Sequence, residues 1–111
     1  MNYDKKIRGG SLLARALHDR GIENVFTLSG GFCNPALEGF MECQINVINC
    51  PHEQIAGHLA DGHTRITRKP SVCLVGPEGF ANAVPSMMEA WGERSPVIYI
   101  TGSSTLKRQG S

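Results

Sequence analysis

The sequence predicts an α/β fold in which helices cover both faces of a parallel sheet, giving a three-layer α/β/α domain. Four short apolar or β-branched segments alternate with four segments whose apolar residues recur at helical spacing. Strands that alternate with helices of about 10–15 residues form right-handed βαβ units and a parallel sheet. A length of 111 residues, with 41% hydrophobic and 19% charged residues, suits one folded domain over residues 1–111.

The first half of the chain is expected to hold two helices and two strands. Apolar residues at helical spacing predict a first helix that ends at Gly21: Leu12, Leu13, Ala16 and Leu17. The β-branched segment 24–28 predicts the first strand. Pro35 can begin a second helix with one apolar face, made of Ala36, Leu37, Phe40 and Met41. Residues 45–48 predict the second strand, which stops before Pro51.

The second half repeats this alternation. A third helix is expected over residues 53–67, followed by a strand over 72–75. A fourth helix is expected over residues 82–93, where Pro85 suits only the first turn. Its apolar stripe is expected to pack on the sheet: Val84, Met87, Met88 and Trp91. The segment 97–101 predicts the last strand.

Charge and hydropathy exclude several classes of function. Eleven basic and ten acidic residues give a formal charge of +1, which is too weak to gather nucleic acid or a membrane surface. The longest aliphatic or aromatic run, residues 97–100, is far shorter than the ~20 residues of a membrane span, and no signal peptide is recognisable. The cysteines lack Cys-x-x-Cys spacing, so we expect free thiols in a reducing cytoplasm: Cys33, Cys43, Cys50 and Cys73.

Three loops are candidates for a binding site, because parallel sheets bind ligands beyond the carboxyl ends of their strands. They are Ser29-Gly30-Gly31, the segment 51–54 and Gly76-Pro77-Glu78-Gly79. We expect them to meet at one edge of the sheet. None has the spacing of a dinucleotide fingerprint or of a nucleoside triphosphate loop, so neither ligand is favoured.

Histidines in the third helix invite a metal interpretation. On a helix, His52 and His58 are about 240° apart and His58 and His63 about 140° apart, so the three rings cannot face one ion. We therefore expect no metal site and instead solvated histidines, with Asp61 and Arg65 paired at i, i+4.

Glu53 has two possible roles on spacing alone. An acidic residue in the first turn of a helix complements the helix dipole. Glu53 also begins at the carboxyl end of a strand, and small residues on or near its face would let another backbone or a flat ligand approach closely: Ala56, Gly57, Ala60 and Thr64. The spacing leaves both roles open.

Several ordered motifs together resemble one known family. They are Leu12-Leu13-Ala14-Arg15-Ala16-Leu17, Gly21-Ile22-Glu23-Asn24-Val25-Phe26, Ser29-Gly30-Gly31, His52-Glu53-Gln54, Ala60-Asp61-Gly62, Arg65, Lys69-Pro70, Val72-Cys73 and Asn82-Ala83. Over about residues 9–102 the chain resembles the N-terminal pyrimidine-binding domain of thiamine diphosphate enzymes, closest to the acetolactate synthase-like group of 2-oxoacid decarboxylases and carboligases. The resemblance implies the strand order 2-1-3-4.

The resemblance also implies roles for particular residues. Glu53 would be catalytic, because it would hydrogen-bond the N1′ nitrogen of the thiamine diphosphate aminopyrimidine and so activate the cofactor. The other cofactor contacts would come from Ser29, Gly30, Gly76, Pro77 and Asn82, and the substrate contacts from Gly31 and Gln54. The sequence departs from the family pattern in having an extra residue between Gly76-Pro77 and Asn82, and in His63, Thr64, Arg68 and Ser71, which replace a usual Tyr-Ala and two glycines.

In the resembling family, the diphosphate and its magnesium ion are bound by a separate domain. We therefore expect this chain to be incomplete beyond its fourth strand and inactive alone. Its partners would be a 2-oxoacid substrate and a diphosphate-binding domain of the same or another chain, in a homodimer or tetramer. Two alternatives remain: a truncated, non-catalytic orphan domain or partner subunit, and a flavodoxin-like domain that binds a small ligand.

Overall fold

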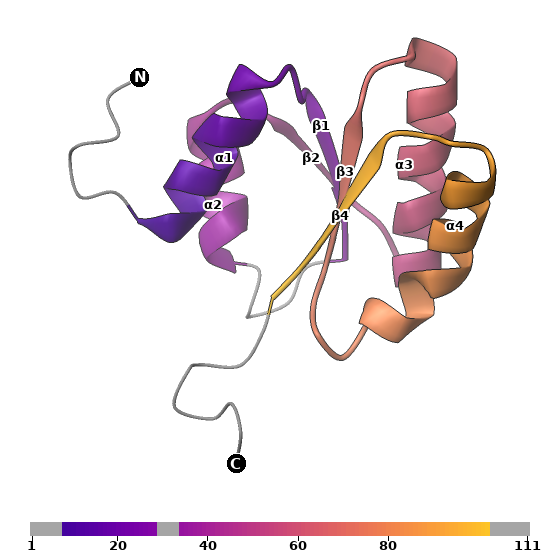
Figure 1. The fold of residues 1–111 in the computed structure, drawn as a ribbon. Helices are drawn as coiled ribbons and strands as arrows, with labels where there is room; N and C mark the ends of the chain where they lie inside the picture. Colours follow the sequence, from indigo (N-terminus) through magenta and orange to yellow (C-terminus); the bar gives the residue numbers. More distant parts are fainter. Residues whose placement is uncertain (1–7, 29–33, 103–111) are drawn as a thin grey trace.

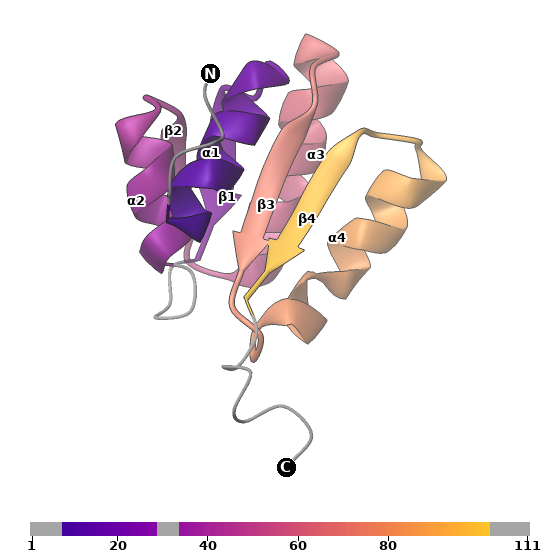
Figure 2. The same ribbon diagram turned by 60° about the vertical axis from the view of Figure 1, so that its left-hand side comes forward.

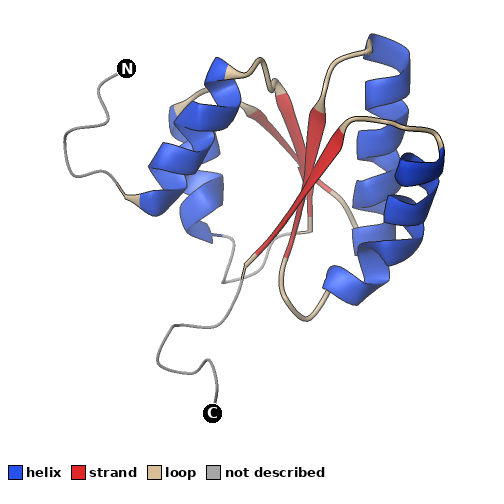
Figure 3. Cartoon of the chain, in the orientation of Figure 1, coloured by secondary structure: helices blue, strands red, loops and turns tan. Residues whose placement is uncertain are grey.

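The computed structural model describes residues 8–28 and 34–102, which form three layers (Figures 1 and 3). The elements alternate regularly along the chain: α1 (Gly9–Asp19), β1 (Asn24–Thr27), α2 (Asn34–Glu42), β2 (Asn46–Asn49), α3 (Glu53–Thr67), β3 (Ser71–Val75), α4 (Phe80–Gly92) and β4 (Val97–Thr101). Helices α1 and α2 cover one face of the sheet and α3 and α4 the other (Figure 1). The α/β prediction is confirmed. No helix in the described ranges is long and apolar enough to cross a membrane.

The four strands are parallel, as Figure 2 shows, and lie in the order β2-β1-β3-β4. This is the order that the resemblance implied. Phe26 of β1 is in register with Ile48 of β2 on one side and with Cys73 of β3 on the other. All five residues of β3 are buried, because this strand has a neighbour on each side and helices on both faces.

Alternate strand residues divide the core into two halves. Val25, Val72 and Leu74 pack with residues of α1 and α2, whereas Phe26 and Cys73 pack with residues of α3 and α4. Successive side chains of a strand point to opposite faces, so one strand can supply both halves. The apolar runs of the two central strands, β1 and β3, are therefore buried on both faces, whereas the outer strands β2 and β4 are partly exposed.

Each helix ends at a residue with positive φ. Gly21, Gln44, Arg68 and Arg94 have φ values of 87°, 60°, 60° and 57°. After α2, the N–H of Ile45 donates to the carbonyl of Phe40 at 2.9 Å, which completes a Schellman motif. Ile45 therefore belongs to the helix terminus, and β2 begins one residue later than the predicted segment 45–48.

The prediction for the fourth helix was partly wrong. The helix begins at Phe80, so Pro85 is its sixth residue and not part of its first turn. Its buried residues are small, namely Ala83, Ser86 and Ala90. Much of the predicted core stripe is exposed instead: Val84 is 38% exposed, Met88 61% and Trp91 79%. This small face packs closely against α3, where a Cβ atom at Gly57 would overlap with Oγ of Ser86, so bulky side chains would not fit there.

Helices α1 and α2 show the same kind of error at single positions. Met41 was expected on the buried face of α2 but is 71% exposed, and Leu12 of α1 is 40% exposed. Leu17 and Phe40 are buried as expected. Helical spacing identified the helices, but one turn offers two adjacent apolar positions and only packing decides which faces inward.

Candidate functional site

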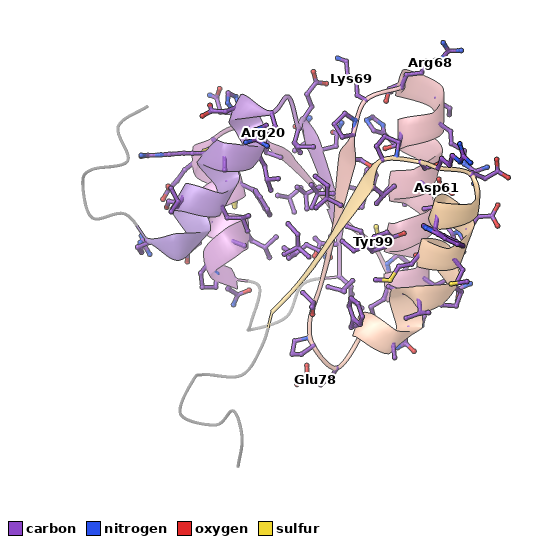
Figure 4. The ribbon with its side chains drawn as sticks, in the orientation of Figure 1. Arg20, Asp61, Arg68, Lys69, Glu78 and Tyr99 are labelled. Carbon is purple, nitrogen blue, oxygen red and sulfur yellow. The ribbon has the colours of Figure 1, made fainter. Side chains whose placement is uncertain are left out.

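The carboxyl ends of the parallel strands meet at one edge of the sheet. Helix α3 begins there directly after β2, and the turn 76–79 follows β3 at the same edge. In Figure 4, Glu78 marks this edge, whereas Arg68 and Lys69 lie at the opposite end of the molecule. Two of the three predicted loops therefore meet as expected. The third, with Ser29, Gly30 and Gly31, lies outside the described residues.

Glu53, the first residue of α3, lies at this edge of the sheet. Its side chain starts in the first turn of α3 and is only 7% exposed. The side-chain amide of Asn82, from the first turns of α4, donates a hydrogen bond from Nδ2 to Oε1 of Glu53 at 3.0 Å. This hydrogen bond joins two residues that are 29 positions apart in the chain. Both were expected from the sequence to belong to the site. This hydrogen bond fixes the orientation of the Glu53 carboxyl group.

Gly79 lies directly against the Glu53 carboxyl group. A Cβ atom at Gly79 would lie 2.7 Å from Cδ of Glu53, which is closer than real Cβ contacts allow, and 3.0 Å from Oε2, which is a tight contact. The absence of a side chain at Gly79 therefore leaves room for the carboxylate beside the turn. Gly79 was predicted from the sequence to lie in a glycine loop, but without this role.

The two neighbours of Glu53 point elsewhere. His52 caps α3, because its Nδ1 accepts a hydrogen bond from the backbone N–H of Gln54 at 3.0 Å. Gln54 is exposed, with its Nε2 3.5 Å from Nε2 of His58. Within His52-Glu53-Gln54, only the glutamate turns into the protein.

The turn after β3 brings Asn82 into reach. The N–H of Gly79 donates to the carbonyl of Gly76 at 3.1 Å, and the N–H of Asn82 donates to that of Gly79 at 3.0 Å. Pro77 lies within this turn and is half-buried. The extra residue between Gly76-Pro77 and Asn82 is accommodated by this turn and by the first residues of α4, which begins at Phe80 and not at residue 82 as expected.

The small-residue strip of α3 is filled by protein. Ala56 and Ala60 are completely buried in the core half formed with α4. A Cβ atom at Gly57 would lie 1.8 Å from Oγ of Ser86 on α4. The strip was expected to let either another backbone or a flat ligand approach α3. In the structure α4 approaches there, and no room is left for a flat ligand.

Thr64 and Ser71, which both depart from the family pattern, hydrogen-bond to each other. The hydroxyl of Ser71 donates to the carbonyl of Ala60 at 2.8 Å, so Thr64 is the donor in the 2.7 Å hydrogen bond between Thr64 and Ser71. Both hydroxyls are buried and satisfied. The only sequence signal for this pair was that two unusual polar residues occur in the same chain.

The predicted Asp61–Arg65 pair is present. Arg65 donates from Nε and Nη2 to the two carboxylate oxygens of Asp61, at 3.0 and 2.8 Å, and also to Glu89 at 3.2 Å. Burial raises the pKa of Asp61, but the Ser95 hydroxyl and the Arg65 guanidinium together outweigh it and lower the pKa below 3.8. No cluster of three metal-ligating side chains occurs among the described residues.

The cysteines of the described ranges are free thiols: Cys43, Cys50 and Cys73. Burial raises the pKa of Cys73 to about 12, with a further contribution from Cys50. A thiol with so high a pKa is not a nucleophile at neutral pH. Cys33 lies outside the described residues. The described cysteines therefore belong to the core and not to the candidate site.

Comparison with known proteins identifies the family. The family described as thiamine pyrophosphate enzyme, N-terminal TPP binding domain, matches residues 7–111. The chain belongs to this family. Thiamine diphosphate is accordingly the cofactor that the family implies for this TPP-binding domain.

Curated relatives extend this assignment. The TPP-binding domain is 36% identical over 105 residues to the acetolactate synthase large subunit of Mycobacterium tuberculosis, covering 94% of this chain and 19% of the relative. It is 35% identical over 101 residues to the acetolactate synthase large subunit of Haemophilus influenzae, covering 88% and 18%. The chain thus spans about a fifth of the length of these relatives, as one domain of an acetolactate synthase-like protein would.

Solved structures share the fold. Benzoylformate decarboxylase from Polynucleobacter necessarius matches with a TM-score of 0.81 at 21% identity, over 91% of this chain and 19% of the other. A Mycobacterium smegmatis protein described as a thiamin diphosphate-dependent enzyme matches with a TM-score of 0.82 at 24% identity, over 93% and 20%. The TPP-binding domain therefore has the fold found in these longer enzymes.

Proposed function

We propose that this chain is the pyrimidine-binding half of a thiamine diphosphate-dependent 2-oxoacid decarboxylase or carboligase, and that Glu53 activates the aminopyrimidine ring of the cofactor. The observation that carries the proposal is the buried Glu53 carboxylate at the carboxyl edge of the sheet, with Oε1 held by Asn82. Family membership supplies the cofactor, and the acetolactate synthase relatives suggest the reaction class.

The residues present fit this cofactor. Asn82 occupies Oε1 of Glu53, so Oε2 remains to exchange a proton with a ring nitrogen. A Cβ at Gly79 would fill the space beside Oε2, and the glycine keeps that space free. The bound cofactor would supply the electron sink that a 2-oxoacid decarboxylation needs. Glu53 would hold the proton at the pyrimidine nitrogen, and Asn82 would keep the carboxylate in position to do so.

Other residues are proposed on family position alone. Gly76 and Pro77 would contact the pyrimidine ring from the turn after β3, together with Asn82. Ser29 and Gly30 would approach the reactive end of the cofactor. Gly31 and Gln54 would contact the substrate, and the exposed position of Gln54 leaves it accessible to one.

A second domain would have to complete the site. We propose that a diphosphate-binding domain of the same or another chain holds the diphosphate and a magnesium ion, in a cytoplasmic homodimer or tetramer of the full enzyme. In support, the chain spans about a fifth of its curated relatives, and exposed apolar side chains line α3 and α4: Ile55, Leu59, Val84, Met88 and Trp91. Apolar surface of this kind marks contact sites. The chain by itself would then be inactive.

The test is to replace Glu53 by glutamine in the intact enzyme that contains this chain. Loss of the proton-exchanging carboxyl should slow exchange of the cofactor C2 proton by about 10²–10⁴-fold. NMR of the cofactor in deuterated buffer measures this exchange directly. The matched control is Glu78→Gln, which removes an exposed carboxylate at the same edge and should leave the rate unchanged. Wild-type exchange in Glu53→Gln would refute the assignment.

A second candidate function is a non-catalytic orphan domain or partner subunit. It is favoured by the outer edge of β4, with which no other strand of the described residues pairs. Decarboxylation of a 2-oxoacid on mixing this chain with a separately expressed diphosphate-binding domain would refute it.

A further inference from the structure

Helices α3 and α4 contact each other at matching positions one turn apart. They run side by side on one face of the sheet (Figures 1 and 2). Glu53 meets Asn82 in the first turns, and Gly57 meets Ser86 one turn later. Glu53 and Gly57 are four residues apart on α3, and Asn82 and Ser86 are four residues apart on α4. The two contacts therefore lie about 6 Å apart along the helices.

Ser86 is tied to the sheet at this second contact. Its side chain is completely buried, and its hydroxyl donates to the carbonyl of Ala83 at 2.6 Å. The hydroxyl of Tyr99, on β4, is therefore the donor in the 3.1 Å hydrogen bond to Ser86. In Figure 4, Tyr99 lies between its strand and the α3–α4 layer. Burial raises the pKa of Tyr99, so the hydroxyl keeps the proton that it donates.

Gly57 sets the distance between the two helices. A Cβ atom there would lie 1.8 Å from Oγ and 2.6 Å from Cβ of Ser86, and 3.4 Å from the hydroxyl of Tyr99. The first two distances are impossible for real atoms, whereas the third is an ordinary contact. Any side chain at position 57 must therefore push α4 away unless position 86 becomes smaller.

We propose that Gly57, Ser86 and Tyr99 are positioning residues that hold Asn82 against Glu53. Helices are stiff over one turn, so a displacement of α4 at Ser86 carries Asn82 with it. The functional meaning of this contact rests on the proposed role of Glu53. The geometry itself does not, and it can be tested in this chain without cofactor.

The experiment follows the side-chain amide resonances of Asn82 by NMR in the folded chain. The Glu53→Ala variant gives the resonance positions without the carboxylate. In Gly57→Ala, the Asn82 resonances should move to those positions. In the double variant Gly57→Ala/Ser86→Gly, both obstructing atoms are gone, but so is the Ser86 hydroxyl that Tyr99 holds. Its resonances should therefore match those of the single variant Ser86→Gly and not those of Gly57→Ala. The matched control is Gly62→Ala on the same helix, where a Cβ meets nothing within 4 Å and the resonances should not move.

Two results would overturn the proposal. One is a folded Gly57→Ala variant with wild-type Asn82 resonances, and the other is a double variant that folds but keeps the resonance positions of Gly57→Ala. If Gly57→Ala does not fold, the variant Tyr99→Phe tests the proposal instead, because it removes only the hydroxyl that holds Ser86 to β4. Its Asn82 amide should exchange faster with solvent than in the wild type, and unchanged exchange would overturn the proposal. A failure of Glu53→Gln in the cofactor test leaves these outcomes unaffected.

Discussion

At the scale of single residues, α3 carries two buried carboxylates with different hydrogen-bonding surroundings. Both oxygens of Asp61 are taken by the Arg65 guanidinium. Glu53 has one oxygen held by Asn82 and the other beside a glycine. A carboxylate with both oxygens bound to a cation holds the structure together, whereas one with a free oxygen can exchange a proton. This difference supports the role proposed for Glu53.

Asp61 should make the stability of the chain depend on pH. Its pKa is lowered in the folded state, so its stabilisation is fully present above the pKa of the unfolded chain and is lost as the pH falls through the folded pKa. We expect Asp61→Asn to lower the free energy of unfolding at about pH 7 and to cost less at about pH 3. Urea denaturation of both proteins at the two pH values measures this. A cost that does not change with pH would contradict the prediction, and Glu89→Gln is the exposed control.

At the scale of elements, the helix termini carry avoidable backbone strain. Every helix ends at a residue in the left-handed region, yet only the first uses glycine there. Gln44, Arg68 and Arg94 each place a Cβ where it crowds the backbone. Arg68 follows α3 directly, far from the candidate site in Figure 4, so its conformation can be changed without disturbing Glu53.

Arg68→Gly should therefore stabilise the chain. Glycine adopts positive φ without steric cost, and we expect the free energy of unfolding to rise by about 1 kcal/mol. Denaturation in urea checks the value. Arg68→Ala is the matched control, because it removes the same charge and keeps the Cβ. Equal stabilities of the glycine and alanine variants would show that the strain is not the cause.

At the scale of the whole molecule, the two outer strands of the sheet, β2 and β4, each have an edge that pairs with no other strand of the described residues. Strand β4 is the outer strand next to β3, and within the described ranges no strand pairs with its far edge. Ile98 of β4 is 40% exposed, and Trp91 and Met88 of α4 are exposed as well. Unpaired strand edges and apolar patches of this kind promote association.

The isolated chain should consequently associate as its concentration rises. A charge on the edge strand opposes pairing, so Ile98→Lys should shift the chain toward the monomer. Light scattering coupled to size exclusion measures the mass of both proteins. Thr101→Ser, a conservative change at an exposed position on the same strand, should behave like the wild type. A monomeric wild-type chain at high concentration would contradict the prediction.

The alternation of elements, the helix 53–67 and the choice of Glu53 as a candidate site residue followed from the sequence, because they depend on local periodicity, turn residues and an ordered set of motifs. The inward faces of α4 and α2 did not follow, since Met88, Trp91 and Met41 fit a helical stripe as well as Ala83 or Phe40 do. Only the close crossing at Gly57 and Ser86 decides that the small residues pack inward. The contact between Glu53 and Asn82, and the space that Gly79 leaves beside them, also depend on how separate elements pack. Local patterns determine which elements form, and packing between distant segments decides which side chains meet.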